Sequence, residues 1–437
     1  FVRYLASTQM GKFLGCWFAG LRKSRKGLGV LELFKQVLCF FADGTSRHLT
    51  HFDELAKDAG YAATIETPES KMASSHQVKR FFGSFSFVLY FLFRRVLGAL
   101  TVWRLRVRQP DVVVLDVDTM VMDNDEAEVR EGVGPTYKKV KGFQPLQMTW
   151  GRYIVDAVFR GGSKHGNSGS IVVEMVTRMV KLIRKKYRAG VPIVLTCDAG
   201  FFDQENFAAF EALGIGFICG GKLYKDIQAF VAKCPKGDWT VYRSETAKER
   251  EWEVLAFGDR RGSWRRFRRA LYCRPLTDNG QGLLQFARPE TVLYTNLGMG
   301  FAIDEALRTA GLEAWLSDAG VLERYHGRGA NELAHRGLKD FGSETLPFKR
   351  FESNAAFYYT MVMAFNLFES FKEDVVRDVI PVASYATTVR RKLFDIAGKI
   401  VRKGRSTILR IAEAAWARLG FAALWHRANQ APVVALE

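Results

Sequence analysis

Apolar residues in the middle of the chain occur in short runs bounded by polar residues, the pattern of buried strands. The predicted strands cover residues 111–121, 144–150, 152–162, 191–200 and 215–221. Between them, residues 168–190 place apolar side chains at helical spacing and end at Gly190, and a second helix is predicted at 204–213. A strand meander followed by alternating strands and helices predicts a mixed α/β sheet with flanking helices.

The pattern changes on either side of this central region. Residues 222–290 read as short strands separated by polar turns, and they predict a β-rich insertion that stands outside the central sheet. A buried strand returns at 291–297, and helices follow, including the apolar stretch 354–371. The expected divisions are a helical region at 1–105, a core at 106–221 and 291–375, the insertion at 222–290, and a basic helical tail at 376–437 for dimerisation or DNA contact.

Composition adds a charge argument. Lys and Arg number 64 against 46 Asp and Glu, giving a net charge of +18 and a pI near 9.6. Such a surplus favours a polyanionic partner, although a solvated basic surface would give the same balance. Six cysteines form no CxxC pair and read as reduced thiols of a cytoplasmic protein, not a disulfide framework or a zinc site. The most apolar stretch, 85–100, contains Arg94 and Arg95 and fits a core helix better than a membrane span.

Candidate chemistry is concentrated at two strand ends. Asp118 closes the run VVVLDVD, and Asp198 closes PIVLTCD. Pockets form at such sheet edges, and carboxylate oxygens are the ligands that Mg²⁺ prefers. Asp116 lies on the same strand face as Asp118, so either of the two could be the ligand. Without further motifs, solvated strand-end residues would explain both positions equally well.

The stretch YHGRGANELAHRGLKDF at 325–341 places one glutamate among cations. In a continuous helix, Tyr325, Arg328, Glu332 and Lys339 would share a face roughly 60° wide. Gly327 and Gly329 each cost a helix about 1 kcal/mol, so a break before Glu332 is the alternative. A carboxylate at this position would complete a set of three with the two strand aspartates, and its cationic neighbours would bind phosphates.

The spacing of tyrosine, arginine, glutamate and lysine in this stretch resembles the YREK signature of DDE transposases from bacterial insertion sequences. DVDT resembles that family's first-aspartate motif, where a small hydroxyl residue follows the aspartate, and CDAGFFD resembles the second. The similarity extends over most of residues 110–371. It is greatest to members that carry a β-rich insertion between the second aspartate and the glutamate.

This resemblance implies an RNase H-like catalytic core that uses Mg²⁺ or Mn²⁺, expected as two ions. In that chemistry water attacks the phosphodiester at the element end, and the freed 3′-OH attacks target DNA. The residues that match the family's catalytic metal ligands are Asp118, Asp198 and Glu332. Those that match its DNA-phosphate contacts are Tyr325, Arg328 and Lys339.

The same resemblance sets the expected partners. These are double-stranded DNA at the element ends and at the target, bound by a homodimer, with no membrane involved. Residues 1–105 would bind the element end, and the protein would lie in the bacterial cytoplasm at the nucleoid.

The motif RRGSWRRFRR at 260–269 interleaves arginines with two aromatic residues. We expect DNA-backbone contact from Arg265, Arg266, Arg268 and Arg269, with a solvated basic turn as the alternative. Two other functions compete with transposition. LDVDTM nearly matches the nucleophile loop of haloacid-dehalogenase-type phosphatases, which would make Asp116 the nucleophile. A catalytically inactive DNA-binding derivative of a transposase is the second.

Overall fold

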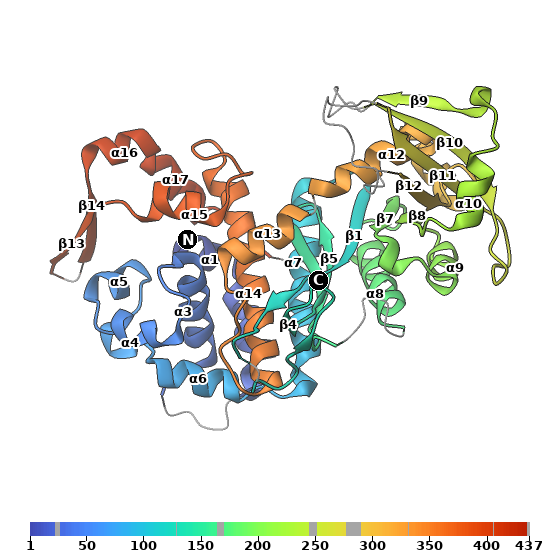
Figure 1. Ribbon diagram of the computed structural model, residues 1–437. Helices are drawn as coiled ribbons and strands as arrows, with labels where there is room; N and C mark the ends of the chain where they lie inside the picture. Colours follow the sequence, from blue (N-terminus) through green and yellow to red (C-terminus); the bar gives the residue numbers. More distant parts are fainter. Residues whose placement is uncertain are drawn as a thin grey trace.

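The computed structural model describes the chain except for residues 22–26, 128, 164–169, 244–250, 277–289, 331, 405 and 435–437. Its centre is a nine-stranded sheet with the order β6-β5-β1-β7-β8-β12-β11-β10-β9. Helices from both ends of the chain gather at the β6 side of this sheet, and strands β9–β12 form the opposite side (Figure 1).

Five strands form the first half of the sheet. They are β1 (Val113–Thr119), β5 (Leu146–Trp150), β6 (Tyr153–Val158), β7 (Ile193–Cys197) and β8 (Gly216–Gly220). β1 pairs antiparallel with β5 and parallel with β7, β5 pairs antiparallel with β6, and β7 pairs parallel with β8. An antiparallel meander with two parallel strands added beside its first strand is the RNase H-like arrangement. The predicted fold class is confirmed.

Two helices connect the parallel strands and cover this half of the sheet. α8 (Ile171–Lys186) precedes β7, and α9 (Gln204–Ala212) lies between β7 and β8. Leu115 of β1 and Met179 of α8 belong to one hydrophobic cluster and are fully buried. The apolar stripe that predicted the helix at 168–190 is therefore the surface that packs on the sheet.

The second half of the sheet corrects one expectation. Its strands are β12 (Thr291–Thr295), β11 (Arg268–Pro275), β10 (Glu251–Asp259) and β9 (Thr240–Arg243). β12 pairs with β8 and β11 pairs with β12, so the strand-rich segment extends the central sheet. The prediction that residues 222–290 stand outside this sheet is wrong, because the edge of β8 continues its hydrogen-bond ladder into β12. Residues 277–289 of this predicted strand-rich segment lie outside the described residues.

The N-terminal region is helical, as predicted. Its helices are α1 (Val2–Ser7), α2 (Met10–Trp17), α3 (Val30–Asp43), α4 (Phe52–Leu55), α5 (Ala59–Thr64), α6 (Ser75–Gly83) and α7 (Tyr90–Arg108). Of these, α3, α6 and α7 pack against α14 (Phe351–Phe371), which is buried along nearly its whole length. The ring of Phe82 lies 5.3 Å from that of Phe357, and the ring of Phe93 lies 5.3 Å from that of Tyr359. Residues 1–105 thus share a hydrophobic core with α14, and their separate domain status remains a prediction.

A buried ion cluster connects three distant segments of this helical part. Arg104 of α7 is 1% exposed and donates to both carboxylate oxygens of Asp374 at 2.7 and 2.9 Å. Asp374 lies in the π-helical turn η9 (Lys372–Val376) and also accepts from the Tyr4 hydroxyl of α1 at 2.6 Å. Because each buried charge has a partner, the cluster holds α1, α7 and the end of α14 in one arrangement.

The C-terminal region departs from the predicted helical tail. It contains α15 (Ala386–Val389), the antiparallel hairpin β13 (Gly398–Lys403) and β14 (Ser406–Ile411), and then α16 (Glu413–Leu419) and α17 (Phe421–Asn429). Residues 398–411 form strands because β-branched Ile400, Val401 and Ile408 favour them, and because Gly404 adopts the positive φ that the turn requires. The prediction of helix across this stretch is wrong.

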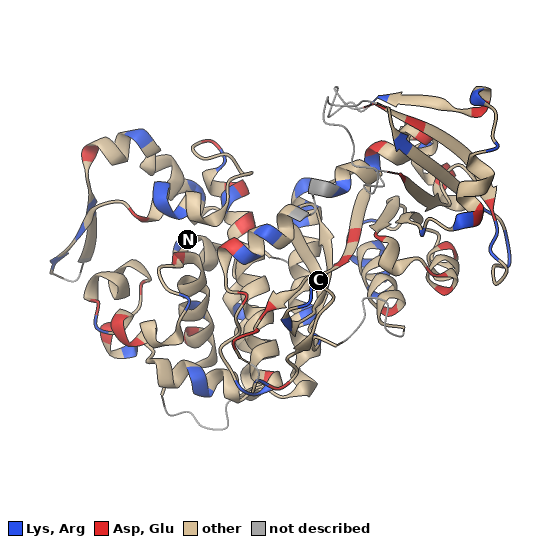
Figure 2. Cartoon of the chain, in the orientation of Figure 1, with Lys and Arg blue, Asp and Glu red and all other residues tan. Residues whose placement is uncertain are grey.

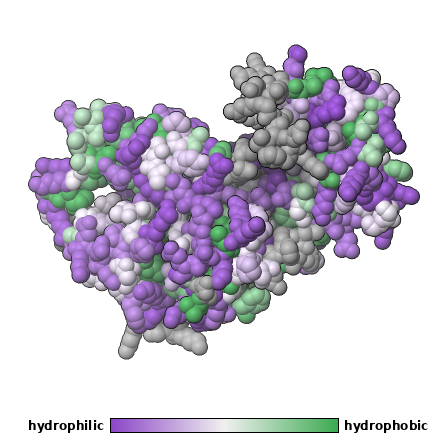
Figure 3. Space-filling view, in the orientation of Figure 1, coloured by the Kyte–Doolittle hydropathy of each residue, from purple (hydrophilic) through white to green (hydrophobic). Residues whose placement is uncertain are grey.

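The remaining short elements lie around the sheet. They are β2 (Met122–Asp123), β3 (Gly134–Pro135), β4 (Lys141–Phe143), α10 (Lys225–Val231), α11 (Ala302–Thr309), α12 (Asp318–His326) and α13 (Glu332–Phe341). Among the described helices none alone is long and apolar enough to cross a membrane. One pair, Glu69–Gly83 with Phe87–Arg108, passes on length and composition but is bent by 94°. The face shown in Figure 3 is mostly hydrophilic, with hydrophobic side chains in small scattered areas.

Candidate active site

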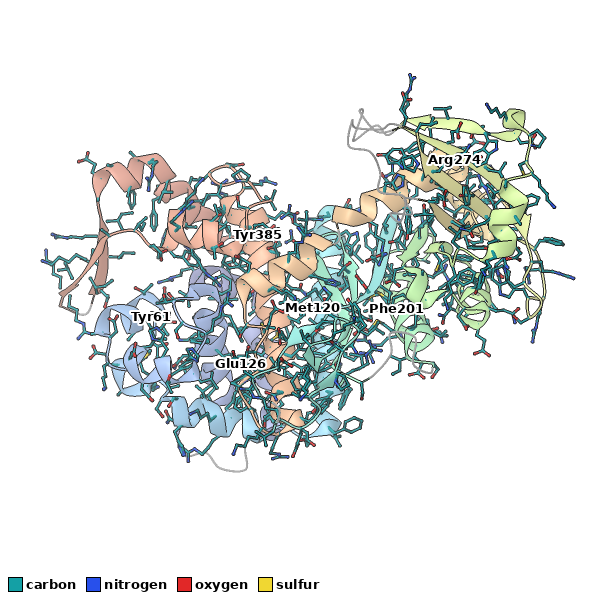
Figure 4. The ribbon with its side chains drawn as sticks, in the orientation of Figure 1. Tyr61, Met120, Glu126, Phe201, Arg274 and Tyr385 are labelled. Atoms are coloured by element: carbon teal, nitrogen blue, oxygen red, sulfur yellow. The ribbon has the colours of Figure 1, made fainter. Side chains whose placement is uncertain are left out.

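The two predicted strand-end aspartates meet at one edge of the sheet. β1 and β7 are parallel neighbours whose register pairs Asp116 with Thr196 and Val117 with Cys197. Continuing that register by one residue brings Asp118 beside Asp198. Met120 and Phe201, which follow these strand ends in the sequence, both lie in the central part of the molecule in Figure 4. The sheet topology therefore brings together two carboxylates that lie far apart in the chain.

Asp118 and Asp198 remain partly accessible. The Asp118 side chain is 26% exposed, and its Oδ1 accepts the Thr119 N–H at 2.7 Å. Oδ1 of Asp198 accepts the N–H of Gly200 at 2.8 Å. The pKa of Asp198 is raised, first by burial and second by the negative charge of Asp118. A neighbouring carboxylate that disfavours the ionisation of Asp198 is an arrangement that a bound cation would relieve.

Asp116 is in a different environment from Asp118. It is 4% exposed and accepts from the Arg328 Nε at 2.6 Å and from the Thr196 hydroxyl at 2.8 Å. Burial raises the pKa of Asp116 to about 7, although the Arg328 charge acts in the opposite direction. The Asp116 carboxylate is thus engaged inside the protein, and Asp118 is the aspartate of β1 that faces the edge of the sheet.

The stretch with the YREK spacing does not form one continuous helix. Tyr325 lies in the last turn of α12, Arg328 lies in the short 3-10 turn η8 (Gly327–Ala330), and Glu332 begins α13. The single-face geometry is therefore wrong, and the alternative with a break before Glu332 is confirmed. Glycines at 327 and 329 weaken helical continuity at this point. Asn331 and the side chain of Glu332 lie outside what the structure describes.

The three residues matched to DNA contacts lie in different surroundings. Arg328 points toward the aspartates, with its Nη2 3.8 Å from Oδ2 of Asp118. The Tyr325 hydroxyl lies against the end of β8, where a Cβ added to Gly220 would be 2.6 Å from it. Burial raises the pKa of Tyr325 to about 12, so this hydroxyl stays protonated near neutral pH. Lys339, in the last turn of α13, pairs with Glu344 at 2.6 Å.

One side chain near the aspartates was not assigned a role from the sequence. Nδ1 of His335 lies 3.8 Å from Oδ2 of Asp118. The available signal was its position three residues after Glu332, which places both on one side of a helix. The pairing of Arg328 with Asp116 was also missed, and no local pattern indicates it, because the two residues are 212 positions apart.

The arginine cluster at 260–269 divides into two kinds of side chain. Arg268 is 4% exposed, forms an ion pair with Glu211, and lies 5.0 Å from the ring centroid of Phe207. Arg269 donates to the carbonyl oxygens of Leu297 and Leu316 at 2.6 and 2.7 Å and pairs with Asp318. The prediction of DNA contact is wrong for the buried Arg268, whose charge is used inside the fold.

Arg269 is also held inward by these contacts. Arg265 and Arg266 are exposed, and for them DNA contact remains a prediction. Arg266 lies 3.8 Å from Glu211 and has 57% of its side chain exposed, so it can reach a ligand in solvent.

The oxygen donors that the structure describes at this site are of the type that binds a hard divalent cation. Asp118 and Asp198 supply carboxylate oxygens, which Mg²⁺ and Mn²⁺ prefer. Within the described part of the chain, no three His, Cys, Asp or Glu side chains gather as a metal-binding group. The third predicted ligand, Glu332, has its side chain outside that part, although its helix begins beside the Arg328 turn.

Comparisons with known proteins found one family model and a similar solved structure. A family model described as transposase DDE domain group 1 matches residues 17–433. Among solved structures, a cryo-EM synaptic complex of the piggyBac transposase with hairpin DNA has 12% sequence identity and a TM-score of 0.46. The alignment covers 89% of this chain and 78% of that one. No curated protein matches the sequence.

Proposed function

This chain belongs to the transposase DDE domain group 1 family, and from that premise we propose that it cuts DNA at the ends of an insertion sequence and joins those ends to target DNA. The observation that carries the proposal is the convergence of Asp118 and Asp198 at one sheet edge, with Arg328 beside them. DDE transposases generally use divalent metal ions. The match of residues 325–339 to the YREK signature supports placement in that subgroup.

The metal ligands we propose are Asp118, Asp198 and Glu332, holding Mg²⁺ or Mn²⁺, as two ions. When bound, such ions activate a water and stabilise the charge that develops on the leaving oxygen. Asp118 and Asp198 qualify because their oxygens reach the sheet edge, whereas both the ion pair and the burial of Asp116 keep it from the solvent. Glu332 qualifies by its place at the first residue of α13.

The reaction consists of two phosphodiester exchanges. In the first, the oxygen of water bonds to phosphorus, the bond from phosphorus to the 3′ oxygen breaks, and the element end is left with a 3′-OH. In the second, that 3′-OH bonds to a target phosphorus, and a target 3′ oxygen leaves. The number of phosphodiester bonds is conserved in the second step, so no external energy source is needed.

The cations of the YREK stretch would bind DNA phosphates beside the aspartates. Arg328 already points its guanidinium to this edge, because Asp116 holds its Nε. The Tyr325 hydroxyl remains a donor near neutral pH and could bond a phosphate oxygen near the end of β8. Lys339 would have to exchange its pairing with Glu344 for a phosphate. We propose duplex DNA at element ends and target as the partner, bound by a homodimer at the bacterial nucleoid.

The phosphatase alternative is disfavoured by the surroundings of Asp116. A nucleophilic aspartate needs an accessible oxygen, and this carboxylate is 4% exposed and bonded to Arg328 and Thr196. An inactive DNA-binding derivative predicts the same fold and the same DNA affinity. Only cleavage distinguishes it from an active transposase.

The test is metal-dependent nicking of labelled element-end DNA, with ends taken from inverted repeats that flank the gene. We expect nicking with Mg²⁺ or Mn²⁺, its loss on chelation, and retention of DNA binding in a gel shift. Glu332→Gln keeps the side chain's size but removes its charge, and should lower the nicking rate by orders of magnitude at unchanged DNA affinity. If Glu332→Gln nicks as fast as the parent, the proposed site is wrong. If the parent binds the ends without nicking, the inactive derivative is the correct description.

A further inference from the structure

The C-terminal hairpin of β13 and β14 forms a separate two-stranded sheet at the outer edge of the helical part of the molecule (Figure 1). The residues from 396 to 412 include five Lys or Arg and no Asp or Glu. Figure 2 shows basic residues along both strands, with acidic ones returning at α16. The two faces of this basic hairpin have different surroundings.

One face of the hairpin is used within the protein. Arg402 forms an ion pair with Glu69 of the N-terminal region. On the same face, Ile400 lies against α5, where a Cβ added to Gly60 would be 4.0 Å from its Cγ1. Leu409 is the cross-strand partner of Ile400 and shares this face. These contacts fix the orientation of the hairpin, so its opposite face points away from α5.

The opposite face carries three exposed cations. Strand alternation and the hairpin register place Lys399, Lys403 and Arg410 there together. None of the three forms an ion pair with any side chain that the structure describes. Val401 and Ile408, which are cross-strand partners, lie between the cations. This set of five residues is called the outer hairpin face below.

The pairing within the outer hairpin face is unfavourable by itself. Lys399 and Arg410 lie directly opposite each other across the two strands. Like charges in this position repel and destabilise a strand pair. No carboxylate in the described part of the chain forms an ion pair with these cations, so an anion from outside would relieve the repulsion that solvent does not screen. The arrangement is therefore that of a binding surface for a polyanion.

We propose that the outer hairpin face binds the phosphate backbone of duplex DNA. The inference rests on the proposed function for the presence of DNA, and it adds the surface that DNA contacts far from the aspartates. A two-stranded ribbon fits the major groove in width, and lysines that line one face of it reach the flanking phosphates. Apart from the cations, the side chains that the structure describes on this face are those of Val401 and Ile408, which have no hydrogen-bonding group. The contact is therefore independent of base sequence.

The test compares the full-length protein with the variant Lys399→Gln/Lys403→Gln/Arg410→Gln. The dissociation constant for a duplex of arbitrary sequence is measured over a range of salt concentrations. We expect the slope of log affinity against log salt to fall by up to roughly 2.7, about 0.9 for each phosphate that the variant no longer neutralises. The reduction should be the same for duplexes of different sequence. An unchanged slope overturns the proposal, as does a reduction seen with only one sequence.

A matched pair of single variants controls for charge and for folding. Lys403→Gln and Arg402→Gln remove one charge from adjacent residues on opposite faces. We expect Lys403→Gln to reduce the slope and Arg402→Gln to leave it unchanged, with native circular dichroism in both. Equal effects would mean that overall charge acts and not the outer hairpin face, which overturns the proposal. A parent protein that neither binds nor nicks DNA would refute the proposed function itself. If the parent binds and nicks DNA and the triple variant has the same salt slope, the hairpin proposal alone is refuted.

Discussion

Replacing Asp116 and Asp118 separately by asparagine should separate a residue that positions an arginine from one that binds metal. Asp116→Asn keeps an oxygen that can accept from the Arg328 Nε at 2.6 Å and from the Thr196 hydroxyl at 2.8 Å, but it removes the charge. Arg328 stays charged, so the bond that remains is still one to a charged group, which contributes about 1.5–3 kcal/mol, and loss of the acceptor's charge moves it from the upper to the lower end of that range. The interaction between residue 116 and Arg328 is therefore expected to weaken by about 1–1.5 kcal/mol.

That loss sets the size of the expected kinetic effect. If the whole of it appears in the transition state, nicking slows by roughly five- to tenfold, because about 1.4 kcal/mol corresponds to a factor of ten. Asp118→Asn removes a proposed metal ligand, and the loss of several kcal/mol predicts a reduction of at least about a thousandfold. The two variants should thus differ by about two orders of magnitude.

The assay pairs Mn²⁺ titration calorimetry with nicking of element-end DNA on the same protein preparations. We expect Asp116→Asn to bind Mn²⁺ like the parent and Asp118→Asn to lose most of the binding heat. Thermal unfolding of both variants checks that the fold is intact. Loss of Mn²⁺ binding in Asp116→Asn, with retention in Asp118→Asn, would refute the assignment and make the buried aspartate the ligand.

Three further outcomes follow from the contacts described above. Arg268→Gln should destabilise the protein by about 3 kcal/mol in denaturant unfolding, because the buried side chain of Glu211 would keep only the exposed Arg266 as an ion-pair partner, 3.8 Å away. The neighbouring Arg266→Gln should leave stability unchanged and reduce the salt slope of DNA binding by up to roughly 0.9. Equal stability of the two variants would contradict the division of the cluster. Asp374→Asn should lower the free energy of unfolding by about 3 kcal/mol, because the buried Arg104 would keep only weaker partners. An unchanged unfolding midpoint would contradict this. Lys339→Ala should weaken binding to element-end DNA in a gel shift and leave Mn²⁺ binding unchanged, and a loss of Mn²⁺ binding would place this lysine in the metal site instead.

Several features of the fold were readable because they depend on neighbours in the chain. The alternation in DVVVLDVDTMV identifies a buried strand and assigns Asp116 and Asp118 to one face of it. Helical spacing over 168–190 identifies α8, and the glycines at 327 and 329 indicate the break before Glu332. Resemblance of the surrounding motifs to those of DDE transposases allowed Asp118, Asp198 and Glu332 to be named as one set, although only the parallel pairing of β1 with β7 brings the first two together.

Other features depended on partners that no local pattern reveals. A short polar-bounded strand looks the same whether it extends the central sheet or forms its own, so the position of β9–β12 was decided by the open edge of β8. In RRGSWRRFRR all the arginines look alike, and packing against Glu211 and Phe207 alone makes Arg268 internal.

The sequence by itself determined the strand and helix periods and the spacing within residues 325–339, because these depend on residues close together in the chain, and it determined the basic charge, which depends on composition alone. Only the tertiary structure decided which charges face each other. Arg328 meets Asp116 across 212 residues, and Arg402 meets Glu69 across 333, leaving Lys399, Lys403 and Arg410 outward. Long-range charge pairing depends on where the packed elements place side chains in space, and residue type alone does not specify that position.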